Sequence, residues 1–455
     1  MGCTRLPLFD PPKSGYSSAG LTPITGLFMR RILLALLFAL ASAAAVAVQT
    51  PGTCSPPGTP TCDPNGVPVP GGGGGGGTGS ESTVTVVNAV TGTVRLGGGR
   101  AVKGAEGIAL DPSTGLVYIG LNGNIISGCP GDASLGGAPL SIGPGTNQLS
   151  IVDPSAPREV AAVQTGQAPI WPTVDPNRRV VYMMGSGGAG TVTVHGASDG
   201  RVTSTITVGG RPHMAGLDYS TGLMLVGNTV RSSNVVSEQN HATIINTATN
   251  TITRTFETSP APHGVVVDQD RDLMYFSAVG DGAIVAVSAA TGQVLFSGVP
   301  KSAYGDSFGG NNMLTRQAAS RRLFQVNTQR GAIGIIVVDE VTLAAEKVIG
   351  FDEQVPWGMT VDEPNRLLFA ALPNADAVAV VDLDTLTYVA RIPVGSCPYA
   401  VAVDPQRRIA VTSNQGTPSE DATASILNLC PVYAATNRLV AGCSAADRFR
   451  LFRRR

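Results

Sequence analysis

A short motif recurs along this chain and constrains its fold more than any other feature of the sequence. Each copy is an apolar run that ends on aspartate, followed by a turn containing glycine or arginine and, seven residues after the aspartate, by a second apolar run. In one copy Gln317 takes the place of the aspartate. The anchor positions are Asp111, Asp175, Asp218, Asp268, Gln317, Asp362 and Asp404. Self-similarity over tens of residues indicates a propeller, a solenoid or another repeat array.

Each anchor belongs to a larger unit of four short β-strands. In the fourth unit we expect strands at 264–268, 273–276, 283–288 and 293–296. The third and fourth runs of most units alternate β-branched residues and are separated by Thr-Gly, Asp-Gly or Thr-Asn turns, which is typical of antiparallel hairpins. Helical periodicity is almost absent, so the sequence predicts an all-β fold.

Seven anchors predict a β-propeller of seven four-stranded blades, with six or eight blades as alternatives. An additional strand pair, 83–87 and 93–96, precedes the first anchor, whereas the last unit loses its pattern after residue 427. We expect the N-terminal strands to complete the last blade and close the ring, because closure leaves no sheet edge open for aggregation.

Two of the units resemble a known repeat. Residues 400–414 read AVAVDPQRRIAVTSN, and residues 376–395 read DAVAVVDLDTLTYVARIPVG. These units resemble the YVTN-type β-propeller repeat, and the resemblance covers roughly residues 81–430, although no literal Tyr-Val-Thr-Asn tetrapeptide occurs and some units carry long insertions. The resemblance implies a secreted or surface protein with kinship to propellers that hold haem or quinone cofactors. It does not imply a particular activity.

The segment before the propeller divides into three parts. Residues 1–28 are interpreted as an upstream extension of the reading frame. Residues 29–47 begin with Met-Arg-Arg, continue with an apolar run and end with small residues, which predicts a secretory signal peptide. The alternative is an uncleaved membrane anchor, because residues 32–48 are nearly long enough to span a bilayer. Residues 48–80 are rich in Pro, Gly and Thr and predict a disordered linker.

The signal peptide implies a secreted, periplasmic or cell-surface protein, and this compartment favours disulfides. Removing the signal leaves an even set of cysteines, namely Cys54, Cys62, Cys129, Cys397, Cys430 and Cys443. Cys129 and Cys397 are expected on one face of adjacent units in a closed ring, so we predict that they pair. Cys54 with Cys62 and Cys430 with Cys443 are then local pairs, although the sequence leaves other pairings open.

The charge balance gives no indication of a nucleic-acid partner. The net charge is −1 and charged residues make up 14% of the chain, so no strongly basic surface is expected. The propeller is expected over 81–440, and the basic segment 441–455 is interpreted as a frayed tail. We expect a monomer that touches a membrane only if the signal remains uncleaved.

The position five residues before each anchor predicts the candidate site. The innermost strand enters the central channel there, on the face where the links between blades and the loops between second and third strands gather. Around the ring, this position holds Glu106, Ile170, His213, His263, Asn312, Trp357 and Tyr399. All of these except Ile170 are candidate ligand-binding residues. The insertions 122–147, 229–240, 301–312 and 415–421 are expected on the same face, where function commonly concentrates.

His213 and His263 lie on adjacent units and are the candidate metal ligands, with Glu106 or Asn312 completing the site. The alternative is that these side chains only pack the channel entrance. The leading hypothesis is a secreted module that binds a protein or small-molecule ligand at this face. The alternative function is an enzyme, either a metal-assisted hydrolase or lactonase or an oxidoreductase with a non-covalent cofactor. The sequence identifies no specific cofactor and no catalytic residue.

Overall fold

The computed structural model describes residues 84–125, 140–141, 146–229, 240–258, 261–279, 282–301, 313–328, 333–352 and 354–444. They all belong to one compact unit, Glu81–Arg455. The expected extension, signal peptide and linker, and the tail from residue 445 onwards, lie outside the described residues. No helix within the described ranges is long and apolar enough to cross a membrane.

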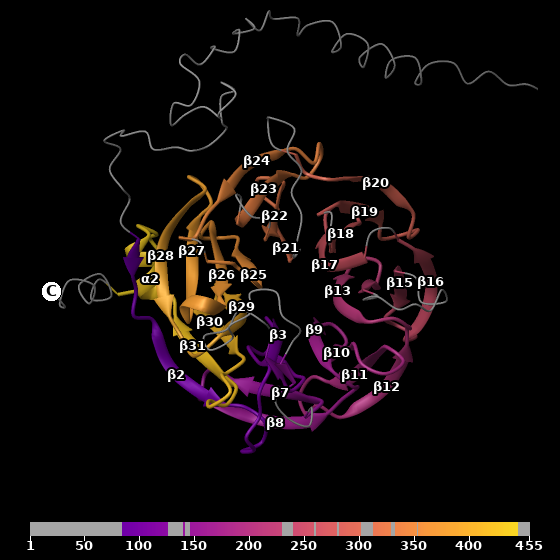
Figure 1. The fold of residues 1–455 in the computed structure, drawn as a ribbon, viewed down its shortest axis with the longest axis horizontal. Helices are drawn as coiled ribbons and strands as arrows, with labels where there is room; N and C mark the ends of the chain where they lie inside the picture. The colour runs from indigo at the N-terminus through magenta and orange to yellow at the C-terminus, as the bar shows by residue number, and fades with distance from the viewer. Residues whose placement is uncertain are drawn as a thin grey trace, which may run out of the picture. The chain divides into compact units, whose positions relative to one another are not determined.

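Seven blades, each with four antiparallel strands, surround a common axis, which confirms the predicted seven-bladed β-propeller (Figure 1). Blade 1 consists of β3 (Ala105–Leu110), β4 (Val117–Leu121), β7 (Gln148–Asp153) and β8 (Arg158–Gln164). Blade 2 consists of β9 (Pro169–Asp175), β10 (Val180–Gly185), β11 (Thr191–Gly196) and β12 (Val202–Thr207). Blade 3 consists of β13 (Pro212–Asp218), β14 (Leu223–Asn228), β15 (His241–Asn246) and β16 (Thr251–Glu257). Blade 4 consists of β17 (Ala261–Asp268), β18 (Leu273–Val279), β19 (Ile284–Ser288) and β20 (Val294–Gly298). Blade 5 is β21 (Leu314–Gln317), β22 (Arg322–Asn327), β23 (Gly334–Asp339) and β24 (Ala345–Ile349).

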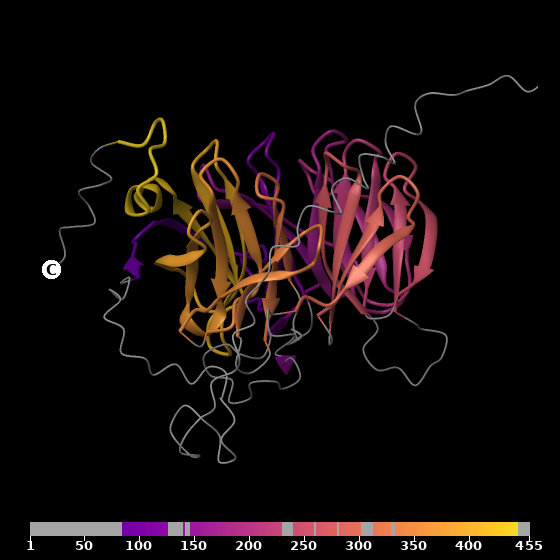
Figure 2. The same ribbon diagram turned by 90° about the horizontal axis from the view of Figure 1, so that it is seen from above.

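Blade 6 is β25 (Met359–Asp362), β26 (Leu367–Leu372), β27 (Ala377–Asp382) and β28 (Thr387–Pro393), with the short 3-10 helix η1 (Pro373–Ala375) between β26 and β27. Blade 7 is β29 (Pro398–Asp404), β30 (Ile409–Asn414), β31 (Thr423–Asn428) and β2 (Val90–Arg95). A two-stranded hairpin, β5 (Asn124–Ile125) with β6 (Leu140–Ser141), branches from blade 1. The first strand of each blade lies innermost, and neighbouring first strands contact one another around the axis. The side view in Figure 2 shows the strands standing along that axis.

The ring is closed by one N-terminal strand rather than by the expected pair. β2 pairs antiparallel with β31 as the fourth strand of blade 7, with Thr93 opposite Ser425. The second expected strand does not join that blade, because β31 already supplies its third strand. Instead β1 (Thr85–Val86) pairs parallel with β28 and gives blade 6 a fifth strand. Ion pairs from Arg95 and Lys103 to Asp421, 2.7 and 3.3 Å long, reinforce the closure.

The repeated aspartate caps the turn between the first and second strands. Asp111 Oδ1 accepts hydrogen bonds from the amide and hydroxyl of Ser113, 2.8 and 2.6 Å long. Asp175 accepts from the Arg178 amide and guanidinium, 3.0 and 2.9 Å long. The seven anchor side chains are buried, with at most 3% of each residue exposed. Short polar side chains stabilise turns in this way because they replace backbone hydrogen-bond partners.

The glycine of the motif has a conformational cause. The residue four positions after every anchor is left-handed, with φ between 52° and 79°. These residues are Gly115, Arg179, Gly222, Asp272, Arg321, Arg366 and Arg408. Glycine adopts this conformation without steric cost, and in the other blades the buried anchor holds the turn.

Blade 5, in which Gln317 replaces the aspartate, is stabilised by a buried charged network. Glu340 is 1% exposed and accepts hydrogen bonds from Arg316 and Arg321, 2.7 and 2.9 Å long, and from Arg271 of blade 4. Arg316 also contacts Asp268 of blade 4 at 3.0 Å. Glu340 therefore places a carboxylate at the end of blade 5 where the anchor lacks one, and it links the two blades.

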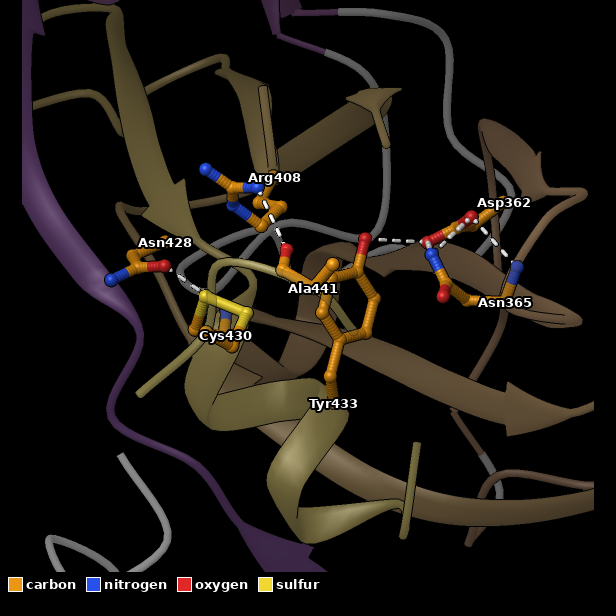
Figure 3. The surroundings of a disulfide bond; sticks show 8 residues. Asp362, Asn365, Arg408, Asn428, Cys430, Tyr433 and Ala441 are labelled. Atoms are coloured by element: carbon orange, nitrogen blue, oxygen red, sulfur yellow. Dashed lines mark hydrogen bonds between the residues drawn. A yellow bond between two sulfur atoms is a disulfide. The ribbon is translucent and has the colours of Figure 1, made fainter. Parts of the chain in front are cut away.

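A short helix that the sequence pattern did not predict covers blades 6 and 7. Helix α2 (Cys430–Ala435) follows β31 and begins with Pro431 in its first turn. The fully buried Tyr433 donates a hydrogen bond of 2.7 Å to Asp362 Oδ2, the anchor of blade 6 (Figure 3). Cys430 and Cys443, which were paired in the sequence analysis, form a disulfide bond beside it. With six residues, the helix is too short to show a period in the sequence.

Replacing Tyr433 by phenylalanine is expected to lower the free energy of unfolding by about 1.5–3 kcal/mol, because a buried carboxylate loses a hydrogen bond. Burial, and to a smaller extent the neighbouring Asp362, raises the pKa of Tyr433 above its ordinary value of 10.0. The stabilisation contributed by the protonated Tyr433 hydroxyl is therefore present below pH 10 and is lost as the pH rises above it. Urea unfolding from pH 7 to 11 should show a shallower alkaline loss in the variant. Tyr388→Phe is the control, since no hydrogen bond of that hydroxyl occurs among the described residues. Equal stability of the two variants contradicts this role of Tyr433.

Glu340→Gln is expected to destabilise the protein by about 3 kcal/mol, because removing one member of a buried charge network leaves its partners uncompensated. Burial alone raises the pKa of Glu340, but hydrogen bonds from Arg316 and Arg321 and the charges of Arg316 and Arg271 lower it below its ordinary value. Its stabilisation is thus present above pH 4.5 and is lost as the pH falls below it. Chemical unfolding of Glu346→Gln provides the control, since its exposed pair with Arg322 is worth at most about 1 kcal/mol. A Glu340 variant as stable as this control contradicts the prediction.

Candidate functional site

The candidate ring lies at a backbone irregularity that recurs in the innermost strands. In blades 1 to 4, two residues of the first strand stand opposite one residue of the second, and one extra residue occurs in blade 7. The extra residues are Glu106 and Gly107, Ile170 and Trp171, His213 and Met214, His263 and Gly264, and Tyr399. A β-bulge bends its strand and redirects a side chain. The bulges therefore fall at or next to the positions, five residues before the anchors, where the sequence analysis placed the candidate site.

Three aromatic side chains from three blades form a cluster in this ring. The ring centroids of Trp357 and Tyr399 lie 5.3 Å apart, and those of Tyr399 and Trp171 lie 6.2 Å apart. Tyr399 is 1% exposed, whereas both tryptophans are partly exposed. These distances are typical of attractive aromatic pairs. The cluster, hereafter the aromatic trio, extends from blade 6 through blade 7 to blade 2.

Trp171 was missed by the sequence analysis, which placed Ile170 in the ring. The bulge in β9 puts both residues opposite Met184, and Trp171 is the one that reaches Tyr399. It crosses blade 1 at Gly107, where a Cβ atom would lie 2.5 Å from the indole. The sequence analysis counted five residues back from each anchor and so ignored the extra residue that a bulge adds. The tryptophan next to the counted position, Ile170, could have indicated which side chain joins the ring.

His213 and His263 face each other between blades 3 and 4. Their ring centroids are 3.8 Å apart and the ring planes are inclined by 31°. His263 is 3% exposed, and His213 is partly exposed. Imidazole nitrogens act as hydrogen-bond donors or acceptors, so the pair adds polar groups to the ring.

Glu106 places a buried carboxylate in the ring. The residue is 3% exposed, and its Oε1 accepts a hydrogen bond from the amide of Asn122, at the end of β4. Its backbone carbonyl accepts a hydrogen bond from the hydroxyl of Ser413 in blade 7. Both contacts fix the strand at the bulge, so the carboxylate has a defined position.

The remaining candidate residues are placed only in part. Asn312 lies outside the described residues. Across the described part of the chain, no group of three or more His, Cys, Asp or Glu side chains is arranged to hold a metal ion. A metal held by His213 and His263 therefore stays a prediction. Most of the insertions 122–147, 229–240 and 301–312 also lie outside the described residues. The loop 415–421 is described, and its Gln415 amide donates to the carbonyl of Cys397.

Cys397 lies two residues before Tyr399, in the link between blades 6 and 7. It is fully buried, has φ of 54° and is disulfide-bonded. Its amide donates to Asp376 Oδ1 at 2.8 Å. The other described cysteines pair with each other, so the partner of Cys397 lies outside the described residues. Cys54, Cys62 and Cys129 lie there too, and the predicted pairs Cys129–Cys397 and Cys54–Cys62 stay predictions.

Comparisons with known proteins agree with the architecture only. No family model matches the chain, and no curated protein matches its sequence. Among solved structures, a chain of Kuenenia stuttgartiensis hydrazine synthase is similar with a TM-score of 0.53 and 14% identity, covering 72% of this chain and 96% of that chain. At this identity the similarity shows the fold alone. The chain is thus a seven-bladed β-propeller by its strand topology and by its structural neighbour.

Proposed function

We propose that this chain is a secreted binding module of the YVTN-type propeller family that holds a ligand with a flat, largely apolar face at the mouth of its channel. The observation that carries the proposal is a contrast between the two ends of the innermost strands. One end repeats a turn-capping aspartate in six of seven blades. At the other end, five of the seven blades have a bulge, and the side chains there vary from glutamate to tryptophan, histidine and tyrosine.

The chemistry of the ring supports a flat ligand. Trp171 and Trp357 are partly exposed around the buried Tyr399, so they offer aromatic faces on a rigid base. Aromatic faces stack against planar or apolar ligand surfaces. Stacked His213 and His263 add polar contacts, and a few polar groups among apolar walls are typical of small-molecule sites.

The proposed secretion is supported by two independent features. Residues 29–47 have the charged start, apolar run and small-residue end of a signal peptide. The propeller also contains the Cys430–Cys443 disulfide and a disulfide-bonded Cys397, and disulfides persist in oxidising compartments.

The two tryptophans provide a direct test, because they are the only ones in the chain and both belong to the ring. Intrinsic fluorescence of the purified protein therefore reports on the channel mouth. Titration with pyrroloquinoline quinone, haemin or Zn²⁺ is expected to change this fluorescence for at least one probe. The double variant His213→Ala, His263→Ala is expected to weaken that binding by about tenfold or more, which corresponds to about 1.4 kcal/mol.

His241→Ala is the matched control, because this histidine lies in β15 and bonds to the carbonyl of Val208 outside the ring. It should bind the probe as the unaltered protein does. Absence of any fluorescence change with all three probes argues against a small-ligand site at the mouth. The histidine pair also supports the enzyme alternative. A stoichiometric metal or chromophore in the purified protein, absent from the double variant, would favour that function over a passive module.

A further inference from the structure

A second candidate site is a pocket on the outer half of blade 2. It has a volume of about 520 Å³, which falls in the range of small-molecule sites. The walls come from the link between β8 and β9, the loop between β10 and β11, and the faces of β11 and β12. The lining residues are Gln164, Thr165, Gly166, Gln167, Gly187, Gly188, Ala189, Thr191, Thr193, Val202 and Thr205. None carries a charge, and most are hydroxyl, amide or glycine residues.

A buried histidine supports the polar wall of this pocket. His195 is fully buried, and its Nδ1 lies 2.7 Å from the carbonyl oxygen of Gly200. Its Nε2 lies 3.0 Å from the hydroxyl oxygens of both Thr165 and Thr193, and these two oxygens are 2.6 Å apart. Burial lowers the pKa of His195, so the ring is neutral at pH 7.

The internal repeat shows that His195 departs from the scaffold. His195 lies on the third strand of blade 2, opposite Val181 of the second strand, and Val181 lies opposite Val174, the residue before the anchor. The same pairing across three strands identifies the equivalent position in every other blade. The other six blades place only aliphatic residues there. They are Val152, Ile245, Val287, Val338, Val381 and Leu427. An aliphatic side chain is thus the structural solution at this position, and blade 2 replaces it with a hydrogen-bonding group.

The network directs the Thr165 hydroxyl in a defined way. Because Nδ1 faces a carbonyl, it carries the proton, and Nε2 is left as an acceptor. The single lone pair of Nε2 accepts one threonine proton. If Thr193 donates it, Thr165 donates to the Thr193 hydroxyl; if Thr165 donates it, Thr193 donates to Thr165 or to the Met183 carbonyl. In either arrangement the proton of Thr165 points into the network. Its oxygen, on the pocket wall, therefore keeps a lone pair to accept a hydrogen bond.

The loop between β10 and β11 adds donors to the pocket. Gly188 and Ala189 are exposed, and within the described residues their amides donate to no protein atom. The loop approaches Gln167 so closely that a Cβ atom at Gly187 would lie 2.9 Å from the Gln167 Cβ. Gln164 and Gln167 are exposed and carry amide groups that donate and accept. The pocket is thus lined by both hydrogen-bond donors and acceptors, and none of its lining side chains is charged.

We propose that this pocket binds a saccharide unit of an uncharged glycan, with Thr165, oriented by His195, as an acceptor for a sugar hydroxyl. A sugar unit carries several adjacent hydroxyls, each a donor and an acceptor, and it matches a wall of alternating threonine, amide and backbone groups. The absence of charged lining residues disfavours acidic sugars and anions, whose burial needs a countercharge. The site lies outside the channel-mouth ring and does not depend on the function proposed there.

The decisive variant is His195→Val, which gives blade 2 the kind of residue found at this position in the other blades. We expect it to fold as well as the unaltered protein but to bind the glycan at least about tenfold more weakly, because Thr165 loses its partner. Thr165→Val should show the same loss, and Thr165→Ser should retain binding. Ile245→Val, the equivalent position of blade 3, is the matched control and should bind normally.

Isothermal titration with cellohexaose, xylohexaose and chitohexaose measures the affinity, with hexagalacturonic acid as the charged probe and an uncharged Gly-Ser-Thr hexapeptide as the peptide probe. Binding of a neutral hexasaccharide that is lost in His195→Val and Thr165→Val and kept in Ile245→Val and His213→Ala supports the proposal. The proposal is overturned if no neutral hexasaccharide binds, if the charged glycan or the peptide binds more tightly, or if the His195 variant binds like the control.

Discussion

The pairing of β2 with β31 is the interaction on which the rest of the ring depends. Each blade packs against two neighbours, and this arrangement is complete only when the first and last blades meet. β2 comes from the N-terminal side of the propeller and β31 from its C-terminal side, so their pairing joins the two ends of the ring within one blade. Arg95, at the end of β2, adds an ion pair to Asp421 of blade 7. The ring of innermost strands that carries the channel-mouth side chains is complete only with this closure.

Along each innermost strand, one end serves the scaffold and the other is free to vary. At the scaffold end, a buried aspartate satisfies the turn, and the left-handed residue that follows completes it. Blade 5 shows how strongly this end needs a carboxylate, because Glu340 supplies one from another turn when Gln317 stands at the anchor. At the other end the bulges hold different side chains in position, so binding groups can change without loss of the fold.

The number of blades and their four-stranded pattern were predictable, because the anchor motif reflects local turn chemistry that repeats. Other features depend on contacts that no local pattern reports. Trp171 replaces Ile170 in the ring because a bulge adds a residue, and β1 joins blade 6 because blade 7 already has its third strand. Helix α2 has too few residues to show a period. His195 reads as an ordinary third-strand residue, and it becomes informative only when the strand registers align it with the aliphatic residues of the other blades.

The parallel strand β1 has a mechanical consequence. The chain reaches β1 before β2, so tension transmitted from the N-terminal side acts first on the short pairing of Thr85 and Val86 with β28. Only when this pairing has been lost does the load reach β2 and the closure of the ring. Under a pull from the N-terminal side, the β1–β28 pairing is therefore the first to open, and the pairing of β2 with β31 that closes the ring is the second.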